Sequence, residues 1–123
     1  MLNFKQYKIM TKTEILDYKQ YYSDSKFWSK LGKVAIHLGR KVCYYALILY
    51  YVLKSPDVSL GNKAIIMGAL GYLILPLDLI PDAIPIAGLT DDAAALKLAY
   101  ETVKASVTPE IEQKVNDKLS QWF

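Results

Sequence analysis

Cysteine and histidine are almost absent from this sequence, which holds one of each among 123 residues. Cys43 has no second cysteine with which to form an internal disulfide, and it lies in an apolar run. His37 is six residues upstream, a spacing that places it on another face of a helix, so the pair does not predict a nucleophilic centre. We therefore expect Cys43 to be a buried, unreactive thiol.

Motifs that mark several enzyme and metal-site classes are also missing. The sequence has no GxSxG nucleophile motif, no glycine-rich phosphate-binding loop and no calcium-loop spacing. Internal repeats are absent, and so is the alternation of apolar and polar residues that marks a half-buried strand. Two lysines interrupt the first ten residues and no small-residue cleavage site follows, so this segment does not resemble a signal peptide. We expect the protein to stay on the cytoplasmic side.

Apolar residues that recur at every third or fourth position predict an all-α fold. We expect a compact bundle of four to five helices in a single domain over residues 1–123. The expected helices cover 11–22, the Ser23 cap to about Lys54, Ser59 or Asn62 to about Leu75, Asp91 to about Ser106, and the Thr108 cap to about Gln121. Gly32 and Gly39 weaken the second of these helices, and they can instead permit close approach of another helix.

Between two core helices, Pro76, Pro81 and Pro85 predict a proline-punctuated loop over residues 76–89. This loop belongs to an apolar stretch, 71–92, in which four aspartates are the only charges between Lys63 and Lys97: Asp78, Asp82, Asp91 and Asp92. Carboxylates in apolar surroundings need partners. Three interpretations are open: the acids cap helices and brace turns, they bind a divalent cation such as Mg²⁺, Mn²⁺ or Ca²⁺, or they perform acid–base catalysis.

The same stretch resembles the signature of the YkvA-like family, the domain of unknown function 1232. The matching positions are Tyr72, Pro76, Asp78, Pro81, Asp82, Pro85, Gly88, Asp91 and Asp92. The resemblance extends over about residues 27–104, and its most specific part is 71–92. It implies no particular activity. Because the family's signature is so apolar, the resemblance does imply membrane association.

Basic residues are concentrated in the first half of the chain. Residues 1–63 carry eleven Lys or Arg and four Asp or Glu, a net charge of +7, whereas residues 64–123 carry four and eight, a net charge of −4. The two halves can pack together and partly cancel, or the basic half can face an acidic partner. Because the lysines are scattered among apolar and aromatic residues, anionic lipid is favoured over nucleic acid. The candidate lipid-facing residues are Lys30, Lys33, Arg40 and Lys41.

The two longest apolar runs, 42–53 and 64–77, are about 18 and 21 Å long as helices, whereas a bilayer core is about 30 Å thick. We therefore predict a membrane-associated protein with a structural or interaction role, no catalytic residues and no required cofactor. The predicted partner is membrane lipid or a membrane protein, no nucleic acid is expected, and self-association is compatible with the sequence. A soluble cytoplasmic interaction module and a divalent-metal-dependent hydrolase are the alternatives.

Overall fold

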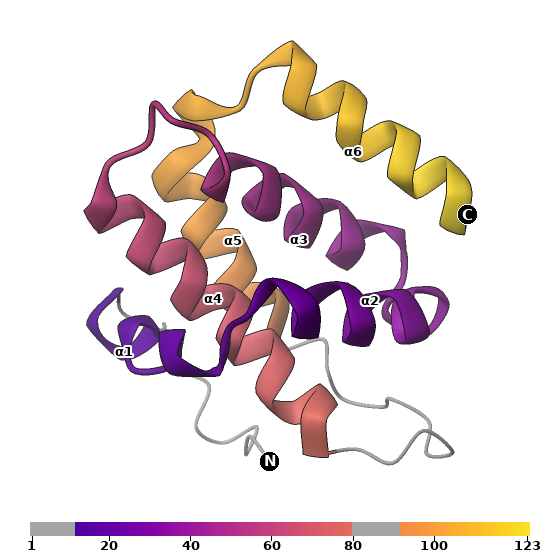
Figure 1. Cartoon of the computed structure of the whole chain (residues 1–123), viewed down its shortest axis with the longest axis horizontal. Helices are drawn as coiled ribbons and strands as arrows, with labels where there is room; N and C mark the ends of the chain where they lie inside the picture. Colours follow the sequence, from indigo (N-terminus) through magenta and orange to yellow (C-terminus); the bar gives the residue numbers. More distant parts are fainter. Residues whose placement is uncertain (1–11, 80–91) are drawn as a thin grey trace.

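The computed structural model describes the backbone of residues 12–79 and 92–123, with side chains over 13–75 and 95–123 (Figure 1). The described chain consists of helices and short connections, with no strand, so the predicted all-α bundle is confirmed. In chain order the elements are α1 (Lys12–Leu16), the 3₁₀ helix η2 (Lys19–Tyr21), α2 (Asp24–Leu38), α3 (Arg40–Leu53), α4 (Leu60–Leu79), α5 (Asp92–Val103), the 3₁₀ helix η4 (Lys104–Ser106) and α6 (Pro109–Trp122).

Helix α3 lies at the centre of the bundle, because it contacts α2, α4, α5 and α6. Half of its residues are buried: Cys43, Ala46, Leu47, Ile48, Leu49, Val52 and Leu53. Helix α6 runs along α3 in the opposite chain direction, and α4 crosses the bundle diagonally (Figure 1). The short α1 and η2 pack on α4. Burial of apolar surface around α3 and α4 is therefore the main source of stability in the described fold.

Local capping signals begin three of the helices where the sequence predicts. The hydroxyl of Ser23 accepts from the Lys26 N–H at 3.1 Å at the start of α2. Ser59 and Thr108 accept from backbone N–H groups three residues ahead in the same way, at 3.1 and 3.2 Å. Each hydroxyl satisfies an N–H that has no partner inside its helix. Thr90, the residue before the predicted helix start at Asp91, lies outside the described residues.

The predicted continuous helix from Ser23 to Lys54 is wrong, because it is two helices joined at Gly39. Gly39 has φ +90° and ψ 159°, a conformation that a side chain strongly disfavours. The Ala35 carbonyl accepts the Gly39 N–H at 3.0 Å and the Cys43 S–H at 3.6 Å, so it joins the two helices across the break. The predicted close approach of another helix is also wrong, since a Cβ built on Gly32 or Gly39 meets nothing within 4 Å.

Helix α4 continues to Leu79, four residues beyond its predicted end, so the predicted loop cannot begin at Pro76. Proline disfavours helix at the preceding residue, but its own φ is compatible with helix and it removes only one backbone hydrogen bond. Leu73 and Ile74, just before it, are 1% exposed. We attribute the extension to this packing, which outweighs the local preference of the residues before Pro76.

Close approach occurs instead between α4 and the N-terminal segment. A Cβ built on Gly68 would lie 2.3 Å from the Ile15 carbonyl oxygen, and one on Gly71 would lie 2.0 Å from the Tyr18 carbonyl oxygen. Ile15 is completely buried. Only glycine at both positions of α4 lets the backbone of α1 and η2 come this close. The signal in the sequence is the pair of glycines three residues apart, which lie on one side of a helix.

Candidate functional site

The junction of α2 and α3 presents a group of exposed basic side chains around an exposed isoleucine. We call this group the basic corner; its members are Lys33, Ile36, His37, Arg40 and Lys41, all of them exposed. Ile36 is 67% exposed, although it belongs to a helix whose opposite side is buried in the core. The break at Gly39 positions the group, because it turns the end of α2 and the start of α3 toward solvent together.

The charges of the basic corner are not neutralised within the described part of the molecule. Among the described side chains, none forms an ion pair with Lys33, Arg40 or Lys41. Lys30, the fourth basic residue singled out from the sequence, differs from these three. It is half-buried and it is not free of partners. Three of the four predicted basic residues are therefore exposed at the α2–α3 junction and form no ion pair with a described side chain.

Aromatic rings and lysines alternate where α2, α3 and α6 meet. We call this group the aromatic–lysine cluster; it consists of Phe27, Trp28, Tyr50, Tyr51 and Trp122 with Lys54, Lys114 and Lys118. Trp28 is its hub, with ring centroids 4.9 Å from Tyr50, 6.5 Å from Tyr51 and 6.3 Å from Trp122. The sequence did not single out this cluster, because its members come from three separate helices.

Each lysine of the cluster lies over the ring of an aromatic residue. The ammonium groups of Lys54, Lys114 and Lys118 are 5.4, 5.7 and 5.2 Å from the centroids of Tyr50, Tyr51 and Trp28 respectively. Such cation–π contacts are worth about 0.5–1 kcal/mol at exposed sites. Aromatic side chains with a polar edge and long lysine side chains are also the residues that suit the boundary between membrane and water.

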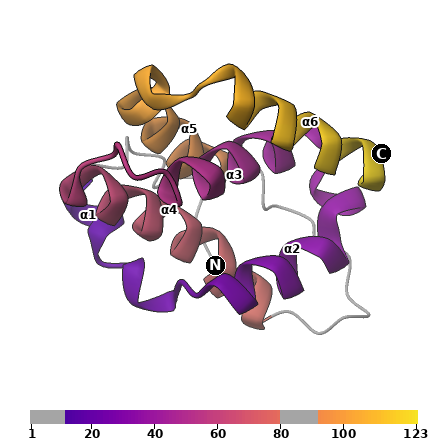
Figure 2. The same cartoon turned by 45° about the horizontal axis from the view of Figure 1, so that its top comes forward.

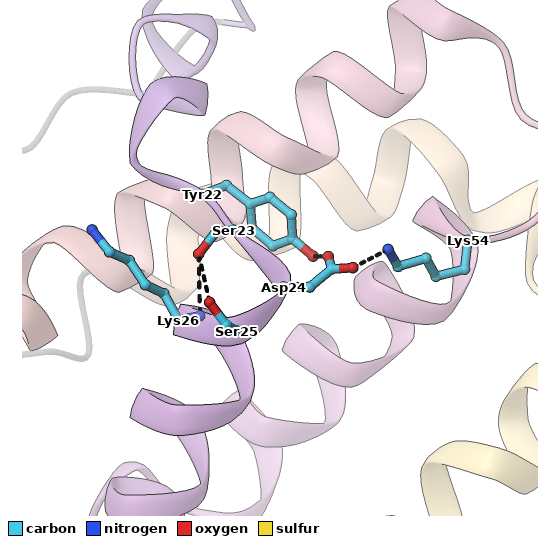
Figure 3. A network of polar contacts seen from close by, with 6 residues as sticks. All are labelled: Tyr22, Ser23, Asp24, Ser25, Lys26 and Lys54. Atoms are coloured by element: carbon cyan, nitrogen blue, oxygen red, sulfur yellow. Dashed lines mark hydrogen bonds and ion pairs between the residues drawn. The ribbon is translucent and has the colours of Figure 1, made fainter.

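A polar network fixes the start of α2 against the end of α3 (Figure 3). The Tyr22 hydroxyl donates to one oxygen of Asp24, and the Lys54 ammonium donates to the other. The hydrogen bond from Lys54, followed by that from Tyr22, lowers the pKa of the Asp24 carboxyl. Burial, followed by the hydrogen bond to Asp24, raises the pKa of Tyr22. Because the Tyr22 hydroxyl and the Lys54 ammonium both donate hydrogen bonds to the Asp24 carboxylate, we assign the network a structural role.

Cys43 is completely buried, and its S–H donates to the Ala35 carbonyl oxygen at 3.6 Å. Burial raises the pKa of the thiol to about 11, so the reactive thiolate is scarce at neutral pH. The predicted burial of Cys43 is confirmed, and this environment supports the prediction that the thiol is unreactive. His37 belongs to the basic corner and is exposed, which agrees with its expected separation from Cys43.

The predicted acidic site falls largely outside the described part of the chain. Asp82 and Asp91, together with Pro81, Pro85 and Gly88, lie beyond the described residues. The structure gives only the backbone of Pro76 and Asp78, near the end of α4, and of Asp92, the first residue of α5. Capping, divalent-cation binding and acid–base catalysis by these aspartates therefore all stay predictions. Within the described side chains, no group of three or more His, Cys, Asp or Glu is placed to hold a metal ion.

Tyr72 is the one signature residue whose side chain is described, and it belongs to the core. It is 8% exposed. Its ring meets the ring of Tyr18 edge to face, with centroids 4.7 Å apart and planes at 85°. Tyr72 lies next to Gly71, where the backbone of the N-terminal segment approaches α4 most closely. In this chain, Tyr72 therefore helps to pack the N-terminal segment against α4.

None of the helices in the described part combines the length and the apolar character needed to cross a bilayer. No curated protein and no solved structure matches the chain. Residues 62–98, which include the 71–92 signature, match the model of a family described as "Protein of unknown function (DUF1232)". The resemblance drawn from the sequence is thus confirmed over this segment, which holds most of α4 and the first half of α5.

Proposed function

We propose that this protein binds reversibly to the surface of an anionic membrane through the basic corner, as a peripheral rather than a spanning protein. The observation that carries the proposal is Ile36, 67% exposed, among Lys33, Arg40 and Lys41, which form no ion pair with a described side chain. An apolar side chain surrounded by free cations matches a layer of anionic headgroups above hydrocarbon.

The magnitudes support reversible binding. A basic residue near an anionic leaflet contributes about 1 kcal/mol, so the three free cations together contribute about 3 kcal/mol. Burying the exposed part of Ile36 adds about 1–2 kcal/mol. The sum, about 4–5 kcal/mol, is close to the marginal and reversible anchoring that a single myristoyl chain gives. Such a protein is expected to exchange between membrane and solution.

The charge distribution of the chain also supports this role. Residues 1–63, which carry the excess of positive charge, include all members of the basic corner. The cytoplasmic leaflet carries the anionic lipids that attract such a surface, so we place the protein at the cytoplasmic face of a membrane. The proposed role is binding, and the partner is lipid itself.

The proposal is tested by sedimenting the purified protein with lipid vesicles. We expect it to pellet with vesicles that contain phosphatidylserine, to stay in solution with purely zwitterionic vesicles, and to be released by high salt, which screens the charges. The test variant replaces Lys33, Arg40 and Lys41 with Gln. The control replaces Lys19, Lys63 and Lys97 with Gln, which changes net charge equally but leaves the basic corner intact.

We expect the test variant to lose most of its binding and the control to lose little. Equal loss in both variants would show that only net charge matters, and the basic corner would then not be the site. A protein that stays in solution with every vesicle at low salt would contradict membrane binding altogether. A soluble interaction module would then be the better interpretation of the same surface.

A further inference from the structure

The membrane-facing surface extends beyond the basic corner along one side of α2. We infer that α2 lies parallel to the membrane plane, with the stripe Trp28–Gly32–Ile36 turned toward the lipid. This inference rests on the proposed function, since it specifies how the same surface meets the bilayer. The three residues are spaced four apart, so they follow one another along one side of the helix.

The stripe borders the buried side of α2 without belonging to it. Phe27, Leu31 and Ala35 face the core and are at most 2% exposed. Each member of the stripe directly follows one of these buried residues in the sequence, so it is rotated from that residue by about 100° around the helix axis. Trp28 is half-buried and Ile36 is largely exposed. Between them, Gly32 leaves bare backbone with nothing within 4 Å of a Cβ position.

The Trp28 end of the stripe carries the chemistry of a membrane interface. Lys118 lies over the Trp28 ring, and the Trp122 ring packs against it at 6.3 Å. Figures 1 and 2 both place the C-terminal end of α6 beside the corner at which α2 passes into α3. Trp28 therefore joins the stripe to the aromatic–lysine cluster, and the α6 part of that cluster reaches toward the basic corner. The surface around the stripe thus combines apolar side chains with cations.

Gly32 provides a direct test, because a larger side chain there adds apolar surface to the stripe without a clash. Gly32→Leu should bind phosphatidylserine vesicles about tenfold more tightly than the wild type, since the new side chain enters the lipid. Gly61→Leu is the matched control. Gly61 also lies in a helix with nothing within 4 Å of its Cβ position, but it stands at the start of α4, away from the stripe.

Tryptophan fluorescence gives a second readout on the same samples. Of the two tryptophans of the chain, Trp28 is the first residue of the stripe and Trp122 packs its ring against Trp28. We expect their emission to shift to shorter wavelength on vesicles, and to be quenched when the lipid acyl chains carry bromine near the headgroup.

The outcomes separate this inference from the proposed function. Wild-type binding with no quenching, and equal affinities for Gly32→Leu and Gly61→Leu, would overturn the stripe and leave binding by the basic corner intact. Absence of binding by the wild type and by Gly32→Leu would overturn both. If Gly32→Leu instead forms dimers in analytical ultracentrifugation without binding vesicles more tightly, the stripe is a contact between copies and the inference is wrong.

Discussion

Gly71→Ala is expected to detach the N-terminal segment from the bundle. The new methyl group would lie 2.0 Å from the Tyr18 carbonyl oxygen, and a backbone atom cannot turn aside as the end of a flexible side chain can. The segment has few other anchors, because Ile15 is its only fully buried side chain among residues 13–22. We therefore expect α1 and η2 to move off α4 rather than α4 to deform.

The cost follows from the contacts that would be lost. Exposing Ile15 costs about 1.5–3 kcal/mol. Losing the edge-to-face contact between Tyr18 and Tyr72 costs about 0.5–1.5 kcal/mol. Replacing glycine with alanine inside a helix stabilises the folded state by about 1 kcal/mol, which offsets part of this loss. The free energy of unfolding should therefore fall by about 1–3.5 kcal/mol.

Urea denaturation followed by circular dichroism measures this change. Gly32→Ala is the control, because its methyl group meets nothing within 4 Å; we expect it to be more stable than the wild type by about 0.5–1 kcal/mol. The double variant Ile15→Ala with Gly71→Ala should cost little more than Gly71→Ala alone, since the isoleucine is already displaced. A Gly71→Ala protein as stable as the wild type would refute the reasoning.

Three further outcomes are expected. Gly39→Ala should lower the free energy of unfolding by about 1–2 kcal/mol in the same assay, because φ +90° disfavours any side chain; an unchanged midpoint would mean that the break at the corner does not depend on glycine. The pKa of Asp24 is lowered in the folded protein, so its contribution to the free energy of unfolding is present above the pKa of the unfolded carboxyl and is lost as pH falls through the lower, folded pKa. The ion pair with Lys54 is about half exposed, so its contribution is small. Asp24→Asn should therefore cost less than about 1 kcal/mol in urea denaturation at pH 7 and nothing at strongly acidic pH. Cys43 should react with a disulfide reagent at pH 8 only as fast as the protein unfolds, whereas fast labelling of the folded protein would contradict its burial.

The sequence predicts local features well where a side chain bonds to nearby backbone. The caps at Ser23, Ser59 and Thr108 depend on residues within one turn, and the structure has all three. The break at Gly39 was missed, because the apolar stripe continues on both sides of it and a glycine does not reveal the sign of its φ. The extension of α4 past Pro76 was missed because packing of the preceding turn decides it.

Contacts between distant segments were not predictable from a single sequence. The pair Gly68 and Gly71 indicates a close approach, but not that residues 15 and 18 make it, and the aromatic–lysine cluster assembles from three helices. Of the candidate sites, the exposure of Lys33, Arg40 and Lys41 follows from their place off the apolar stripe, whereas the half-burial of Lys30 does not. The role of Asp78, Asp82, Asp91 and Asp92 stays a prediction.

The central position of α3 has a consequence for how the molecule opens. Its amides are covered by helices from four directions, so they should exchange with solvent hydrogen only when the whole bundle unfolds. The amides of α1 and η2 should exchange much sooner, because that segment is held mainly by one isoleucine and by backbone contact. Lys41 lies in the first turn of α3, so the basic corner is attached to the slowest-exchanging helix. The proposed membrane-binding surface should keep its shape even while the N-terminal segment opens and closes.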